Sequence, residues 1–136
     1  MEDRYLFRGK TISGKWVRGL LANKNGKWYI SNKAGAPFAY EIRSETICQC
    51  AGLRDDHKNM IFKNDILSLK DEINEIEWKA VVKFGNPNGE YTWGWQLVPV
   101  GEFEGNKDIL LWIETEMEYM QCKVIGNVID NPELLE

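Results

Sequence analysis

The sequence has few of the residues on which many enzymes and metal proteins depend. One histidine and three cysteines occur in 136 residues, an odd cysteine number that disfavours a disulfide framework. No apolar run approaches the ~20 residues of a membrane span. The first residues lack the basic region and the apolar stretch of a secretory signal. These absences predict a soluble, intracellular protein that does not enter a membrane.

The rest of the composition is that of an ordinary folded domain. Hydrophobic residues make up 43% of the chain and charged residues 28%, which excludes a disordered protein. A chain of this length is long enough to bury a core of its own without disulfides or a metal. We therefore expect one domain that spans residues 1–136.

Charge is distributed unevenly along the chain, whose net charge is −4. Residues 1–33 hold eight basic and two acidic residues, a net charge of +6, whereas residues 34–136 carry −10. If the two segments lie side by side, their fields cancel. If they do not, the basic segment is suited to phosphate contact, or the bipolar chain to head-to-tail association.

Short strands separated by turn residues dominate the sequence pattern. Asn25-Gly26 and Asn88-Gly89 mark tight turns, and two stretches, 71–77 and 108–121, have helical spacing. The pattern predicts a mainly β or α+β fold: a small β-barrel or sandwich with a short helical insertion. The expected strands are residues 5–8, 16–21, 27–31, 46–50, 61–62, 66–69, 78–84, 93–98 and 123–129.

Several short motifs near both ends and in the middle of the chain resemble one family. The motifs are Phe7-Arg8-Gly9-Lys10, Gly14-Lys15-Trp16-Val17, Glu45-Thr46-Ile47, Gly52-Leu53 with Asp55, Ile61-Phe62 with Asp65-Ile66, Val124-Ile125-Gly126-Asn127-Val128, and Asn131-Pro132-Glu133-Leu134-Leu135. They resemble the YopX family of small bacteriophage and prophage proteins.

The resemblance implies an SH3-like β-barrel core, an origin in a phage or prophage, residence in the bacterial cytoplasm, and no assigned biochemical function. Residues 71–121 match little of the family pattern and are expected to form a less typical insertion lobe. The motif residues have structural chemistry: Asp65 suits a turn, Gly126 a bend, and Pro132 the end of the last strand. Gly9, Gly52 and Asn131 complete this set.

Metal binding and catalysis have weak support in the residues. Cys48 and Cys50 share one strand face, and Cys122 and His57 would have to complete a zinc site, but no second cysteine pair exists. We expect the cysteines to pack in the core and His57 to lie in an exposed loop. No metal site, cofactor or catalytic residue is assigned.

A second metal pattern is that of a nuclease. Asp65 with Glu77-Trp78-Lys79 imitates the acid and Glu-x-Lys arrangement of metal-dependent nucleases. Roughly one Glu-x-Lys triplet is expected by chance in a chain of this composition, so this alternative is weak. The acidic residues Glu114, Glu116 and Glu118 are expected to form a solvated helix face.

Surface binding is the function that the sequence favours. Trp93 and Trp95, two apart in an expected strand, would place two indoles on one face, which suits a protein contact or a base-stacking surface. We expect a non-enzymatic module that binds a phage protein, a host protein or a second copy. The alternative is nucleic-acid binding through these tryptophans and the basic residues Arg8, Lys10, Lys15 and Arg18.

Overall fold

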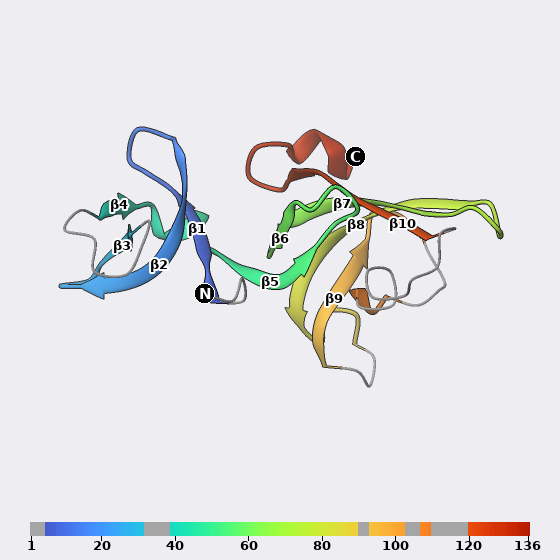
Figure 1. The fold of residues 1–136 in the computed structure, drawn as a ribbon, viewed down its shortest axis with the longest axis horizontal. Coiled ribbons are helices and arrows are strands. Elements are labelled where there is room, and N and C mark those ends of the chain that lie inside the picture. Colours follow the sequence, from blue (N-terminus) through green and yellow to red (C-terminus); the bar gives the residue numbers. More distant parts are fainter. Residues whose placement is uncertain (1–4, 32–38, 90–92, 103–106, 110–119) are drawn as a thin grey trace. The chain divides into compact units, whose positions relative to one another are not determined.

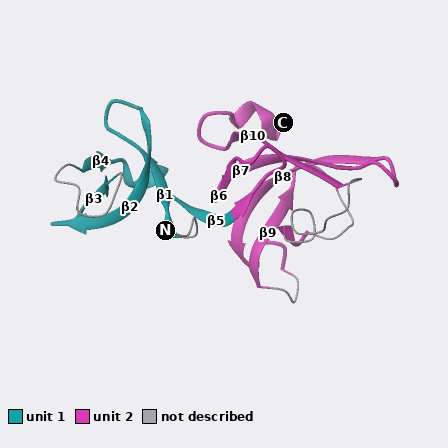
Figure 2. Cartoon of the chain, viewed as in Figure 1, with its two compact units in different colours: residues 1–52 teal, residues 53–136 magenta. Residues whose placement is uncertain are grey.

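The computed structural model describes residues 5–31, 39–89, 93–102, 107–109 and 120–136. The chain divides into two compact units, residues 1–52 and residues 53–136 (Figure 2). The described residues are nearly all in antiparallel strands and tight turns (Figure 1). The mainly β prediction is therefore confirmed.

Unit 1 is an antiparallel sheet with strand order β4-β3-β2-β1, followed by the first residues of β5. Its elements are β1 (Phe7–Lys10), β2 (Trp16–Lys24), β3 (Lys27–Ser31), β4 (Tyr40–Ile42), the 3-10 helix η2 (Ser44–Thr46) and β5 (Cys48–Arg54), which runs into unit 2. Asn25 and Gly26 turn β2 into β3 with φ angles of 55° and 81°, as the sequence predicts for this hairpin.

The core of unit 1 is small and depends on one glycine. Val17, Ile30 and Ile42 are buried together, with Phe7, Leu21 and Ile47 packed against them. A Cβ on Gly9 would overlap the Cγ2 methyl group of Ile42, so β1 crosses this cluster only because residue 9 has no side chain.

Unit 2 contains a four-stranded antiparallel sheet with the order β10-β7-β8-β9. Its elements are β6 (Met60–Phe62), which neighbours β5, β7 (Asp65–Asp71), β8 (Ile76–Gly85), β9 (Gly94–Pro99), β10 (Met120–Asn127) and the 3-10 helix η3 (Pro132–Leu135). Opposed positions on one face are buried: Leu69 lies between Trp78 and Cys122, and Val82 lies opposite Leu97. Each such fully buried aliphatic side chain contributes roughly 1.5–3 kcal/mol.

One sequence expectation is wrong. Residues 71–77 are not helical: β7 and β8 form a hairpin in which Asp71 lies opposite Ile76, and residues 72–75 are its turn. The Asp71 carboxylate accepts the backbone N–H groups of Ile73 and Asn74, so its capping chemistry stabilises a turn in place of a helix.

Most of the helix expected over residues 108–121 falls outside the described part of the chain, which leaves out residues 110–119. At its end, Met120 and Gln121 belong to β10. β8 and β9, from the expected insertion, pair in one sheet with β7 and β10, which flank them in sequence. Within the described strands both sheets have two open edges, and neither closes into a barrel.

A buried carboxylate joins the loop after β5 to the last strand. Asp55 is 4% exposed. Its Oδ1 accepts the N–H groups of His57 (2.9 Å) and Asn59 (2.8 Å), and its Oδ2 accepts that of Val124 in β10 (2.9 Å). Burial alone would raise the pKa of Asp55, but these hydrogen bonds, with one from the Asn59 amide, outweigh burial and lower the pKa. The ionised form is therefore favoured by folding.

A second junction holds the C-terminus against the end of β10. Asn131 Oδ1 accepts the N–H of Asn127 at 3.2 Å, and Asn127 Oδ1 accepts the N–H groups of Ile129 and Asp130. A Cβ on Gly126 would lie 2.5 Å from Asn131 Oδ1 and 2.9 Å from its Cγ. Pro132 then begins η3, so these motif residues together form one C-terminal turn.

Asp55→Asn should weaken the fold and change its response to acid. The substitution puts an amide N–H₂ group among N–H donors, which we expect to cost about 1–3 kcal/mol at neutral pH. Because the folded-state pKa is lowered, the carboxylate's contribution is full above the unfolded pKa, about 3.9, and is lost as the pH falls through the folded pKa. Urea unfolding over a pH series, with Glu102→Gln at an exposed site as control, measures both effects. An acid response in Asp55→Asn equal to that of the native chain would contradict this account.

Gly126→Ala should destabilise unit 2 by displacing Asn131, by about 1–3 kcal/mol as for other overpacked sites. A double-mutant cycle separates the clash from general strain in the strand. In the Asn131→Ala background the same substitution should cost measurably less, since the overlapping amide is absent. Additive effects on the free energy of unfolding would show that the steric contact is not the cause.

Candidate binding surfaces

One end of the β8–β9 hairpin in unit 2 exposes three aromatic side chains. Phe84 is 53% exposed and Trp93 is 75% exposed, while Trp95 is half-buried. The rings of Phe84 and Trp95 meet edge to face with centroids 5.1 Å apart. The Trp93 indole lies over Gly85, within 3.7 Å of where a Cβ would be. We call Phe84, Trp93 and Trp95 the aromatic tip.

The two tryptophans do not share one strand in the way the sequence suggests. β9 begins at Gly94, which has a φ of +139°, so Trp93 precedes the regular alternation from which a shared face was expected. Trp95 contacts Phe84, whereas Trp93 contacts the next residue of β8, Gly85. The structure brings both indoles to the same end of the hairpin, on different neighbours.

The outer side of the β1–β2 hairpin in unit 1 carries the basic residues. Arg8 lies opposite Arg18, and Lys10 opposite Trp16, so all four side chains share one face of the hairpin. Arg8 Cζ is 4.9 Å and Lys10 Nζ is 5.4 Å from the centroid of the Trp16 ring, both within the range of a cation–π contact. We call Arg8, Lys10, Trp16 and Arg18 the basic face.

The accessibility of the basic residues differs. Arg8 is buried and Lys10 half-buried, whereas Arg18 is exposed. Lys15 is also exposed and directly precedes β2. Its backbone N–H donates to Thr11 Oγ1, and its carbonyl accepts the N–H of Thr11. Arg8 therefore supports Trp16 from the protein side, and the more accessible cations are Lys10, Lys15 and Arg18.

The charge asymmetry of the sequence coincides with the division into two units. Residues 1–52 hold nine basic and four acidic residues, a net charge of +5. Residues 53–136 hold eight basic and seventeen acidic residues, a net charge of −9. The basic face thus belongs to a cationic unit and the aromatic tip to an anionic unit.

The residues of the weak nuclease pattern are not brought together. Asp65 is buried at the start of β7, where its Oδ2 accepts the N–H of Phe62 at 2.8 Å, a structural role that its motif predicts. Glu77 lies opposite Lys70 near the other end of β7, five residues or about 17 Å along the strand. Lys79 Nζ donates to the carbonyl of Leu134. Asp65 and Glu77 therefore lie too far apart to share a metal ion.

The three cysteines are fully buried, so the predicted core packing is confirmed. Cys48 and Cys50 lie in unit 1, and Cys122 lies in unit 2. Burial, with the carboxylates of Asp56 and Asp55 nearby, raises the pKa of the Cys122 thiol to about 12, which keeps it protonated and unreactive. His57 is exposed in the turn after β5, as expected.

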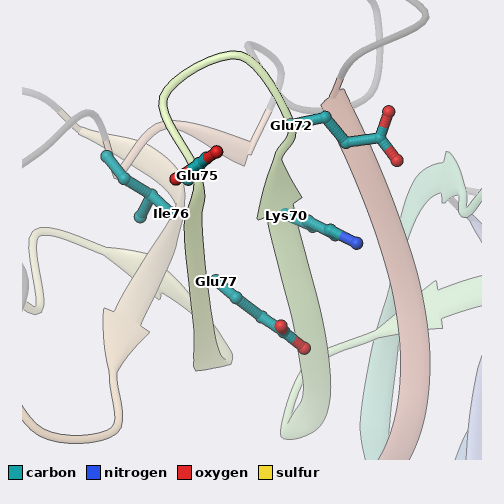
Figure 3. A pocket seen from close by; sticks show the side chains of 5 residues that line it. All are labelled: Lys70, Glu72, Glu75, Ile76 and Glu77. Atoms are coloured by element: carbon teal, nitrogen blue, oxygen red, sulfur yellow. The ribbon is translucent and has the colours of Figure 1, made fainter.

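A shallow depression of about 380 Å³ lies at the tip of the β7–β8 hairpin. It is lined by Lys70, Glu72, Glu75, Ile76 and Glu77, and Figure 3 shows Lys70 and Glu77 pointing to the same side from adjacent strands. Glu72 accepts a hydrogen bond from the Gln121 amide. These are exposed side chains on a hairpin, and in the described part of the chain no three His, Cys, Asp or Glu residues are placed to hold a metal ion. Glu114, Glu116 and Glu118 lie outside the described residues.

Two surface residues escaped the sequence analysis. Trp16 was part of a recognised motif, yet its contacts with the cations of Arg8 and Lys10 depend on the pairing of β1 with β2. If the register of the β1–β2 hairpin is assumed, the spacing of these residues across a short turn places Lys10 opposite Trp16 and Arg8 opposite Arg18. Phe84 became part of the aromatic tip through its pairing with Trp95, which no local pattern indicates.

No helix within the described segments is long and apolar enough to cross a membrane. No curated protein and no solved structure matches this chain. The family model described as YopX protein matches residues 11–136, which include both units from the turn after β1 to the C-terminus. The chain therefore belongs to the YopX protein family.

Proposed function

We propose that this protein is a non-enzymatic module that assembles through protein–protein contact at the aromatic tip. The observation that carries the proposal is the exposure of Trp93 and Phe84 next to Trp95 at one end of the paired strands β8 and β9. Each such side chain brings up to 150–250 Å² of surface to a contact, roughly, and tryptophan is among the commonest hot-spot residues of interfaces.

The charge of unit 2 narrows the chemistry of the partner. An aromatic contact within a unit of net charge −9 favours a partner surface that is apolar at its centre and basic at its rim. Unit 1 of a second copy, with a net charge of +5, meets the charge requirement. Self-assembly is therefore the first form of the proposal to test, and a phage or host protein with a basic surface is the other.

Three observations support the absence of catalysis. Asp65 and Glu77 lie far apart on the neighbouring strands β7 and β8, His57 is in an exposed turn, and Cys122 has a raised thiol pKa. The described depression on unit 2 has no buried polar group aimed into it. A surface of aromatic side chains can bind a partner without the nucleophiles, acids or bases that catalysis needs.

Family membership supports two further parts of the proposal. We infer an accessory role in a bacteriophage or prophage, in the cytoplasm of a bacterial host, because the resemblance to YopX proteins implies that origin. We also infer that the sheets derive from an SH3-like barrel. The short antiparallel strands and the glycines at bends support this, as Gly52 has a φ of +79° within β5.

Trp93→Ala and Phe84→Ala should weaken self-association. Loss of a hot-spot side chain of this kind costs about 2 kcal/mol or more, which corresponds to a dissociation constant raised roughly 30-fold. Sedimentation velocity from low micromolar to several hundred micromolar concentration measures the change. Ile73→Ala removes an equally exposed apolar side chain at the other end of β8 and should leave the association constant unchanged.

A single monomeric species over the whole concentration range would overturn self-assembly. Equal weakening by Ile73→Ala and Trp93→Ala would overturn the assignment to the aromatic tip. Because Trp93 is mostly exposed, its removal should leave the core intact. Circular dichroism of each variant checks that it is folded.

A further inference from the structure

The basic face lies on the side of the β1–β2 hairpin opposite the hydrophobic cluster of unit 1. That cluster lies on the side to which Val17 contributes. Arg8, Lys10, Trp16 and Arg18 alternate with the residues of that side and so face away from it. This side is covered at Arg8, which is buried opposite the buried Cys48 of β5, and it is open at Arg18.

Backbone bonds fix the strand that carries these cations. The N–H of Lys10 donates to Thr46 Oγ1 at 2.8 Å, and the carbonyl of Lys10 accepts the N–H of Arg43 at 2.9 Å. Trp16 is half-buried, so part of its indole remains accessible while Arg8 holds the ring from beneath. A fixed aromatic ring with cations around it is preorganised for a ligand.

The surrounding charge is favourable to an anion. In the described residues of unit 1 the acidic side chains are Glu41 and Glu45. Glu41 lies 3.7 Å from Lys27, an ion pair between β3 and β4. Glu45 is exposed in η2, which neighbours β1. Arg18 is an exposed cation on this face, opposite Arg8, and Lys15 adds an exposed cation directly before β2.

We propose that the basic face of unit 1 binds single-stranded nucleic acid, with Lys10, Lys15 and Arg18 contacting phosphates and Trp16 stacking on a base. Surfaces of this kind combine a cationic track for the backbone with aromatic rings for the bases. A single strand fits better than a duplex, because a base already stacked in a duplex is not accessible to a half-buried indole. The site lies in unit 1 and does not involve the aromatic tip.

Binding should be weak at physiological salt because the chain as a whole has a net charge of −4. Three phosphate contacts predict that the logarithm of the binding constant falls with that of salt with a slope of about −2, at roughly −0.7 per contact for single strands. Fluorescence anisotropy of a short labelled oligothymidylate, titrated with the full chain over a series of salt concentrations, measures this slope.

Variants test which residues act. Lys10→Glu with Arg18→Glu should weaken binding at least about tenfold and flatten the salt slope. The matched control, Lys63→Glu with Lys123→Glu, makes the same charge change at exposed sites of unit 2 and should have a much smaller effect. Trp16→Ala should weaken binding roughly 5- to 150-fold, the range for loss of one stacked base. Trp16→Phe, which keeps an aromatic ring, should retain most of the affinity and guards against loss of folding.

The outcomes separate this proposal from the function proposed for the aromatic tip. Trp93→Ala should leave oligothymidylate binding unchanged, although it weakens self-association. No binding at low salt, or equal losses in the basic-face variant and its control, would overturn the proposal. Equal affinity for duplex DNA, or competition by polyglutamate as strong as by unlabelled oligothymidylate, would show a site for acidic polymers in general and would overturn the stacking role of Trp16.

Discussion

The arrangement of strands in unit 2 depends most on the hydrogen bonds that the Asp55 carboxylate accepts. It is buried, and its two oxygens accept N–H groups from its own loop and from Val124, 69 residues later in the chain. Next to it, Asp56 Oδ2 accepts the N–H of Cys122. These bonds place β10, which pairs with β7 and through it determines the sheet that ends at the aromatic tip. A buried charge is tolerated here because several donors compensate for its loss of water.

Asparagine oxygens play a similar part where β10 ends. Asn64, at a φ of 72°, accepts the N–H of Val128 through its carbonyl and the Lys83 ammonium through its side chain. The family motifs around residues 55, 65 and 126 thus share one physical role: short polar side chains and a glycine replace backbone partners where strands end.

Turns and the burial of single residues could be predicted from the sequence, whereas the pairing of strands could not. The Asn25-Gly26 turn, the buried cysteines and the exposed His57 follow from local chemistry and are confirmed. The helix expected at residues 71–77 is wrong because a cap-forming aspartate and two isoleucines three apart suit a hairpin turn equally well. Trp16 escaped notice because its cation contacts depend on register, which forms only when β1 meets β2. The same limit applies to Phe84 and Trp95.

Binding at the aromatic tip and binding at the basic face should depend differently on salt. An aromatic contact gains free energy mainly from buried area and is nearly independent of salt, whereas a basic face loses affinity as counterions compete. Because one covalent chain joins units of net charge +5 and −9, any polyanion drawn to the first unit is repelled by the second. If the basic face binds nucleic acid as proposed, the negative charge of unit 2 lowers the affinity, and a protein that neutralises unit 2 would raise it.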